Sequence, residues 1–256
     1  MNKTLSILAC LLASNAWAWD DCEFEKRIDT TLDLSSASQL NINARAGDLK
    51  VTGDGDSGEA VIEAVICTSE KEWADASWLK LESGKTAVIS VVDPRDGNSS
   101  WLANEQFSVD LEVSVPAGLA MSINDSSGPL SVSGAGDLTV RDSSGDIDIR
   151  DIRGMVSIED SSGDIDLLQV EGDLVIEGDS SGNISGSGIR GSVLVRQDSS
   201  GNIHFEDVQD DFIVERDSSG NIVADTIGGD FRVLKDGSGS IKATNVTGEI
   251  DIPDKS

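Results

Sequence analysis

The sequence predicts an all-β protein: a right-handed parallel β-solenoid with coils of about 19 residues, each made of two short strands, preceded by a partly antiparallel β cap. The first observation is a tetrapeptide, D-S-S-G, which occurs six times and is followed by one D-G-S-G variant. The copies begin 17, 18, 19, 19, 19 and 19 residues apart. The second observation is the alternation of apolar and polar residues between the copies, which is typical of strands with one buried face. The copies begin at Asp125, Asp142, Asp160, Asp179, Asp198, Asp217 and Asp236.

Residues 1–18 read as a secretory signal peptide. Lys3 precedes an apolar run that is too short to span a bilayer, and Ala16-Trp17-Ala18 has the small-x-small pattern of a cleavage site. An alternative places a lipoprotein box at Cys10, although it leaves a very short apolar region. No later stretch is apolar for long enough to predict a transmembrane segment. We therefore expect an exported protein that is periplasmic, secreted or on the cell surface.

The net charge limits the classes of partner that the protein can bind, and the cysteines predict a disulfide. The chain has 47 acidic and 19 basic residues, for a net charge of −28, and removal of Lys3 with the signal makes it −29. This charge excludes nucleic acid as a partner, since binding to it requires Lys and Arg against phosphates. It favours cations, basic surfaces or simple solubility. Cys22 and Cys67 remain after cleavage, and an oxidising compartment favours a disulfide between them over two buried thiols.

Residues 19–124 are expected to form the N-terminal β region, with one coil-like turn and the cap. Leu40, Ile42, Leu49 and Val51 follow the spacing of the later repeats, so one coil-like turn precedes an insertion. The insertion contains four further alternating runs, at residues 59–66, 78–81, 87–91 and 107–115. Ser83-Gly84, between the second and third of these runs, predicts a hairpin turn.

Residues 125–256 predict the regular solenoid. Ile147, Ile149, Ile152, Val156 and Ile158 mark the five inward positions of one coil, and every later coil repeats their spacing. Stacked coils place equivalent residues side by side. The first inward position should form a buried ladder of Ile147, Ile165, Ile184, Ile203, Ile222 and Ile241. The residue after the turn glycine should form an amide ladder of Asn183, Asn202 and Asn221.

The G-[DN]-I-x-[IVA] turns, the x-G-[DS]-[VLF]-x-[VI] segments, the secretion signal and the irregular β region before the repeats together resemble the bacterial family of exported β-solenoid domains known as putative adhesins. The resemblance covers about residues 40–252. It implies a β-solenoid and an exported protein, and it implies neither a ligand nor a catalytic residue.

The repeated aspartates raise the possibility of calcium, the one cofactor that we consider. Seven of them stack at one turn position about 4.8 Å apart, where their mutual repulsion would favour a bound cation. The competing interpretation is that each aspartate accepts hydrogen bonds from backbone amides of its own turn. The candidate metal ligands are Asp142, Asp160, Asp179, Asp198, Asp217 and Asp236.

An enzyme is the weaker interpretation of function. His204 is the only histidine, and its position between inward residues places it on the outside. The acids Glu206, Asp207, Asp210 and Asp211 crowd one coil, as in a carbohydrate-active enzyme on a β-helix, but the coil has no inserted walls for a cleft. We predict no catalytic residue.

The strongest candidate for partner binding is an outward apolar stripe formed by Val175, Leu194 and Ile213, one residue in each of three successive coils. It could be covered by the cap or the loop that carries Trp101, it could bind a partner, or it could reflect β propensity alone. Trp101 itself is a second candidate contact. We predict an exported, non-enzymatic, adhesin-like scaffold that binds an envelope protein or glycan. The alternatives are a periplasmic carbohydrate-active enzyme and a calcium-binding solenoid.

Overall fold

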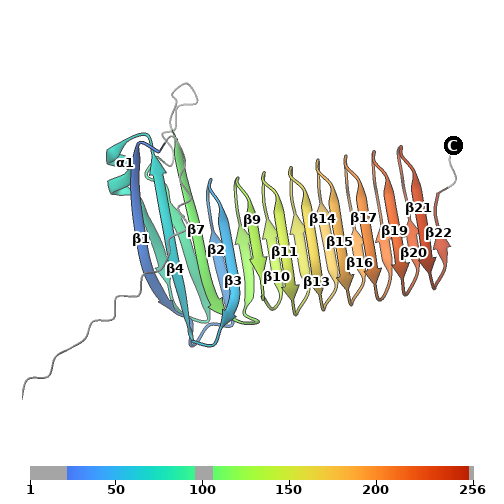
Figure 1. Ribbon diagram of the computed structural model, residues 1–256, viewed down its shortest axis with the longest axis horizontal. Helices are drawn as coiled ribbons and strands as arrows, with labels where there is room; N and C mark the ends of the chain where they lie inside the picture. The colour runs from blue at the N-terminus through green and yellow to red at the C-terminus, as the bar shows by residue number, and fades with distance from the viewer. Residues whose placement is uncertain (1–21, 96–105, 254–256) are drawn as a thin grey trace, which may run out of the picture.

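The computed structural model describes residues 22–95 and 106–253, so the predicted signal peptide and Trp101 lie outside the described residues. The fold is an elongated stack of coils built from two sheets of eleven strands each (Figure 1). The cap region contains β1 (Phe24–Asp33), β2 (Gln39–Asn43), β3 (Leu49–Gly55), β4 (Glu59–Thr68), α1 (Lys71–Ala76), β5 (Trp78–Glu82), β6 (Thr86–Val92) and β7 (Phe107–Pro116).

The stack continues with one strand from each sheet in turn. These strands are β8 (Ala120–Asn124), β9 (Leu130–Ser133), β10 (Leu138–Arg141), β11 (Ile147–Ile152), β12 (Val156–Glu159), β13 (Ile165–Val170), β14 (Leu174–Gly178), β15 (Ile184–Ile189), β16 (Val193–Val195), β17 (Ile203–Val208), β18 (Phe212–Val214), β19 (Ile222–Ile227), β20 (Phe231–Val233), β21 (Ile241–Val246) and β22 (Ile250–Asp251). From β8 onward every pairing is parallel, which confirms the predicted solenoid.

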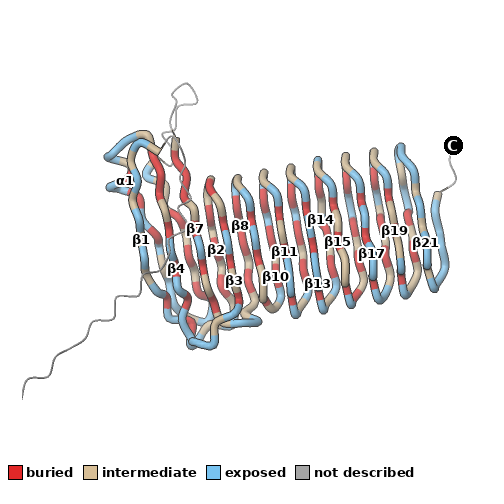
Figure 2. Tube along the Cα trace, in the orientation of Figure 1, coloured by how far each residue is buried: buried red, intermediate tan, exposed pale blue. Residues whose placement is uncertain are grey.

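The core lies between the two sheets, and buried residues alternate with less buried ones along most strands (Figure 2). The predicted isoleucine ladder is confirmed, because Ile147, Ile165, Ile184, Ile203, Ile222 and Ile241 pair in this order. The first five are at most 1% exposed. Ile241 is only half-buried, since it lies in the last coil of the described stack.

Two coils interact through a complementary pair of residues in the core. Gly186 and Phe205 occupy the same inward position in neighbouring coils. A Cβ atom on Gly186 would lie 2.3 Å from the Phe205 ring, so the missing side chain makes room for the phenyl group. The Phe205 ring then meets Phe212, with 5.1 Å between ring centroids, and Phe212 meets Phe231 at 5.3 Å.

The strands of the cap belong to the same two sheets as the strands of the repeats. The coil-like turn expected from Leu40 to Val51 is present as β2 and β3, and these strands pair in parallel with β8 and β9. On their other side lies a second coil, β6 and β7, which is later in the sequence. The spatial order is therefore β6–β7, β2–β3, β8–β9, so the earlier coil lies between two later ones.

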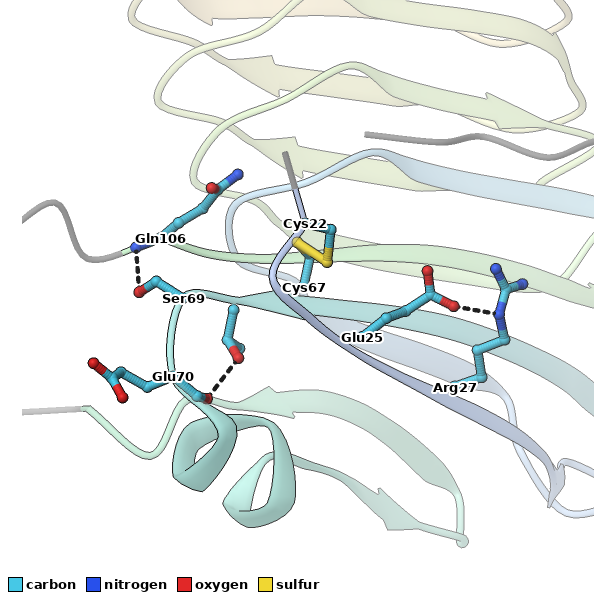
Figure 3. The surroundings of a disulfide bond; sticks show 8 residues. Cys22, Glu25, Arg27, Cys67, Ser69, Glu70 and Gln106 are labelled. Carbon is cyan, nitrogen blue, oxygen red and sulfur yellow. Dashed lines mark hydrogen bonds and ion pairs between the residues drawn. A yellow bond between two sulfur atoms is a disulfide. The ribbon is translucent and has the colours of Figure 1, made fainter. Parts of the chain in front are cut away.

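Antiparallel strands close the N-terminal end of the stack. β4 pairs with β7, β1 pairs with β4, and β5 forms the predicted hairpin with β6. A disulfide joins Cys22, just before β1, to Cys67 near the end of β4 (Figure 3). Beside it, the Ser69 hydroxyl accepts a hydrogen bond from the Gln106 amide at 3.2 Å, which holds the start of β7 to the end of β4.

Candidate functional site

The outward apolar stripe is present on one face of the solenoid. Val175, Leu194 and Ile213 lie on β14, β16 and β18 and are direct neighbours in the parallel register. Each is half-buried, in contrast to the residues on either side of it in its strand, which are fully buried. The cap strands extend the sheets at the end of the stack (Figure 1), so they do not fold over the stripe.

Polar ladders border the stripe on both sides. On one side the Arg196 guanidinium lies between two carboxylates, 2.9 Å from Glu177 and 3.8 Å from Glu215. On the other side the Asp173 carboxylate accepts a hydrogen bond from the Ser192 amide at 2.8 Å in the next coil. An apolar centre with a charged rim is the anatomy of a protein–protein contact surface.

The repeated aspartates are buried, although Asp-Ser-Ser-Gly has the composition of an exposed turn. Asp125, Asp142, Asp160, Asp179, Asp198 and Asp217 are between 0 and 7% exposed. In β10 and β12 the inward alternation simply runs on to the aspartate, through Val156, Ile158 and Asp160. We name this row of six residues the aspartate ladder.

Five of the six ladder aspartates, all but Asp160, accept a hydrogen bond from a backbone amide of their own turn, as the capping interpretation expects. Asp198 Oδ1 accepts a hydrogen bond from the Ser200 amide at 3.1 Å, and Asp179 and Asp217 make the equivalent bond. The second oxygen, Oδ2, has no hydrogen-bond partner among the described residues in any of the six. Burial raises the pKa of Asp198 to about 7, and the carboxylates of Asp217 and Asp179 add to the shift.

The described residues contain no group of three or more His, Cys, Asp or Glu side chains that could hold a metal ion. Calcium needs 6 to 8 oxygen ligands. The aspartate ladder offers two buried unpaired oxygens at Asp160 and one at each of its other members, and Asp236 is a half-buried continuation of the row. These aspartates therefore do not gather three side chains at one point, and calcium binding stays a prediction.

Three of the four acids considered for catalysis, Glu206, Asp207 and Asp211, do not converge. Asp207 lines a long polar groove of about 1040 Å³ that follows one edge of the stack. Glu206 lines a separate hollow of about 280 Å³ with the exposed His204. Asp211 lies in the following turn, where its Oδ1 accepts a hydrogen bond from the Asp230 amide at 2.7 Å. A glycosidase requires two carboxyl groups that face one another across one cleft, and these acids face different ways.

The loop that carries Trp101 begins from a well-packed base. Arg95 pairs with Asp93 at 2.8 Å, and its guanidinium lies 4.7 Å from the centroid of Phe107 and 5.6 Å from that of Trp73. Burial of Asp93 opposes ionisation, but the hydrogen bonds and charge of Arg95 outweigh it and lower the pKa of Asp93. Trp101 itself lies outside the described residues.

Membrane-spanning helices are absent from residues 22–95 and 106–253, where no helix is long and apolar enough to cross a bilayer. No family model matches the chain, and no curated protein matches it.

The solved structures to which the chain is similar include three bacterial proteins. A putative adhesin from Bacteroides fragilis NCTC 9343 has a TM-score of 0.52 and 14% identity, over 89% of this chain and 97% of that chain. A putative lipid binding protein from Parabacteroides distasonis ATCC 8503 gives 0.43 and 14%, over 88% and 96%. A putative cell adhesion protein from Clostridium sporogenes ATCC 15579 gives 0.32 and 17%, over 90% and 99%.

The similarity to the Bacteroides fragilis protein, at 14% identity, is a similarity of fold alone. The resemblance indicated by the repeat motifs is confirmed at that level: the chain has the β-solenoid fold of a protein described as a putative bacterial adhesin.

Proposed function

We propose that this protein is an exported, non-enzymatic scaffold of the cell envelope that binds a protein partner through the stripe of Val175, Leu194 and Ile213. The observation that carries the proposal is the placement of three large apolar side chains, in register, on the outside of three successive coils. Elsewhere on this face the same position holds polar residues, such as Thr139 and Ser157.

A protein partner suits the stripe better than a glycan. Sugars are recognised largely by stacking on aromatic rings, whereas the stripe is aliphatic and rimmed by the Glu177–Arg196–Glu215 ion pairs. Export is supported by the sequence of residues 1–18 and by the Cys22–Cys67 disulfide, because disulfides persist in oxidising compartments. A non-enzymatic role is supported by the divergence of Glu206, Asp207 and Asp211.

Site-specific photocrosslinking in the producing cells tests the proposal. A photoreactive residue at position 194 should give a discrete crosslinked protein, and one at position 139, the same outward position in a polar coil, should not. Leu194→Asp should abolish the capture of that protein by the purified chain, and Thr139→Asp should not. Equal crosslinking at both positions, or capture that survives Leu194→Asp, would remove the stripe as the binding site. Thermal unfolding of both variants establishes that the fold is intact.

A further inference from the structure

The aspartate ladder places six ionisable side chains where the fold otherwise has apolar ones. Each member is 7% exposed or less, and Asp198 is fully buried. Consecutive members are neighbours in stacked coils, as the bridges between Asp179 and Asp198 and between Asp198 and Asp217 show. The feature goes beyond partner binding, since the ladder lies inside the stack and cannot reach a partner.

The hydrogen bonds of the ladder suit an uncharged carboxyl group. A buried carboxylate needs several donors to offset its lost hydration. Each Oδ1 other than that of Asp160 accepts a hydrogen bond from a backbone amide, with N–O distances of 2.7 to 3.1 Å. Each Oδ2 has no partner among the described residues, and Asp160 has none for either oxygen. One hydrogen bond is too little to hold a negative charge, so the neutral acid is favoured.

The charges around the ladder also disfavour ionisation, because they are carboxylates. Raised pKa values in the ladder have burial as their first cause and neighbouring acids as a further one. Asp142 contributes to the raised pKa of Asp125, and Asp236 contributes to that of Asp217. Asp142 and Asp146 contribute for Asp160, and Asp160 and Asp164 for Asp179. Asp217 and Asp179 contribute for Asp198. Basic residues precede two members in sequence, Arg141 before Asp142 and Arg216 before Asp217, but their side chains are exposed.

We propose that the aspartate ladder is a pH-sensitive element of the fold, uncharged and compatible with the core in acid, which weakens the central coils as the surrounding pH rises through neutrality. The row is continuous, so ionisation of one member raises the cost of ionising the next. An exported protein with this element would have a stack of coils that is more stable in acid surroundings than in alkaline ones.

The direction follows from linkage. Burial raises the pKa of Asp125 and Asp198 to about 7 and that of Asp179 to about 6, above the usual value of 3.8. An acid whose pKa is raised in the folded state stabilises the fold below its unfolded pKa, and this stability is lost as pH rises through the folded pKa. Surface acids with a lowered pKa, such as Asp225 and Asp230, act in the opposite direction at lower pH, and ion pairs at the surface contribute little.

Urea unfolding of the full, disulfide-bonded protein at pH 5 and pH 8, with EDTA present throughout, tests the proposal. The wild type should be less stable at pH 8. Asp198→Asn keeps an oxygen acceptor for the Ser200 amide but cannot ionise. It should reduce the rise in the unfolding constant between the two pH values by on the order of tenfold to a hundredfold. Asp210→Asn, an exposed acid in the same coil, is the matched control and should leave the rise unchanged.

The proposal is overturned if the wild type is equally stable or more stable at pH 8, or if Asp198→Asn shows the full wild-type rise. Should Asp198→Asn fail to fold, the carboxyl carbon of Asp198 in the wild type can be titrated by NMR. A midpoint above pH 6 supports the proposal, and a midpoint near the usual value of 3.8 overturns it.

Discussion

At the scale of single residues, the stack depends on glycines where one coil touches the next. Gly201 has φ of 139°, a backbone conformation that is unfavourable for any residue with an L side chain. In addition, a Cβ atom at this position would lie 1.5 Å from the carbonyl oxygen of Gly182. The turn glycine is thus required twice, for its own backbone and for the approach of its neighbour. Gly178, which is one residue before a ladder aspartate, has open space where a Cβ atom would lie, with no heavy atom within 4 Å.

Gly201→Ala should therefore lower the free energy of unfolding by about 2 to 4 kcal/mol, since backbone strain and overlap with backbone atoms both oppose it. Gly178→Ala, the matched control, should change it by less than about 1 kcal/mol. Urea unfolding at constant pH measures both. Equal effects of the two substitutions would show that local crowding at the turn does not determine stability.

Gly186 and Phe205 should be coupled. Gly186→Ala forces a methyl group against the Phe205 ring and should cost about 1 to 3 kcal/mol. In the background of Phe205→Leu, which removes the ring, the same substitution should cost clearly less. A double-mutant cycle of unfolding free energies gives the coupling, and strict additivity would mean that the two coils adjust independently.

The sequence alone could place the inward residues Ile147 and Ile203, because apolar side chains mark their own burial. It could not place Asp160 or Asp198 inside, because an aspartate followed by Ser-Ser-Gly has the composition of an exposed turn. The signal was in the spacing: Val156, Ile158 and Asp160 continue one period-two alternation. Spacing therefore indicated burial where residue type indicated exposure.

At the scale of elements, the cap was the less predictable half. The runs at residues 59–66, 78–81, 87–91 and 107–115 were recognised as strands, and they are β4, β5, β6 and β7. That β6 and β7 form a second coil was not foreseen, because residues 93–106 separate them in the sequence and break the repeat spacing. Helix α1 was also missed, since six residues are too few to show helical periodicity.

The disulfide should matter chiefly for the outer strand of the cap. It closes a loop with a sequence separation of 45 residues, for which loop entropy predicts a stabilisation of about 4 kcal/mol. Cys22 and Cys67 hold β1 to β4, while the repeats fold through their own contacts. After reduction, hydrogen exchange should increase in β1 and stay unchanged in β11 to β19. Faster exchange throughout the repeats would contradict this division.

At the scale of the whole molecule, net charge opposes compaction. The chain carries 47 acidic and 19 basic residues, and most of the ion pairs between them are exposed. Salt screens this repulsion over distances of about 10 Å at 0.1 M. Raising sodium chloride from 10 to 300 mM should raise the melting temperature by a few degrees, the change that about 1 kcal/mol produces in a chain of this size. The gain should shrink near pH 4, where the carboxylates are partly neutral.

The interleaved order of the cap gives the two ends of the molecule different mechanical behaviour. Under tension from the C-terminus, each coil can peel from its single remaining neighbour, releasing about 60 Å of chain at a time. At the N-terminal end, the coil of β2 and β3 is held between β6–β7 and β8–β9 and cannot leave until one of them has moved. Force on this protein would therefore unfold it coil by coil from the C-terminal end, while the N-terminal end stays folded.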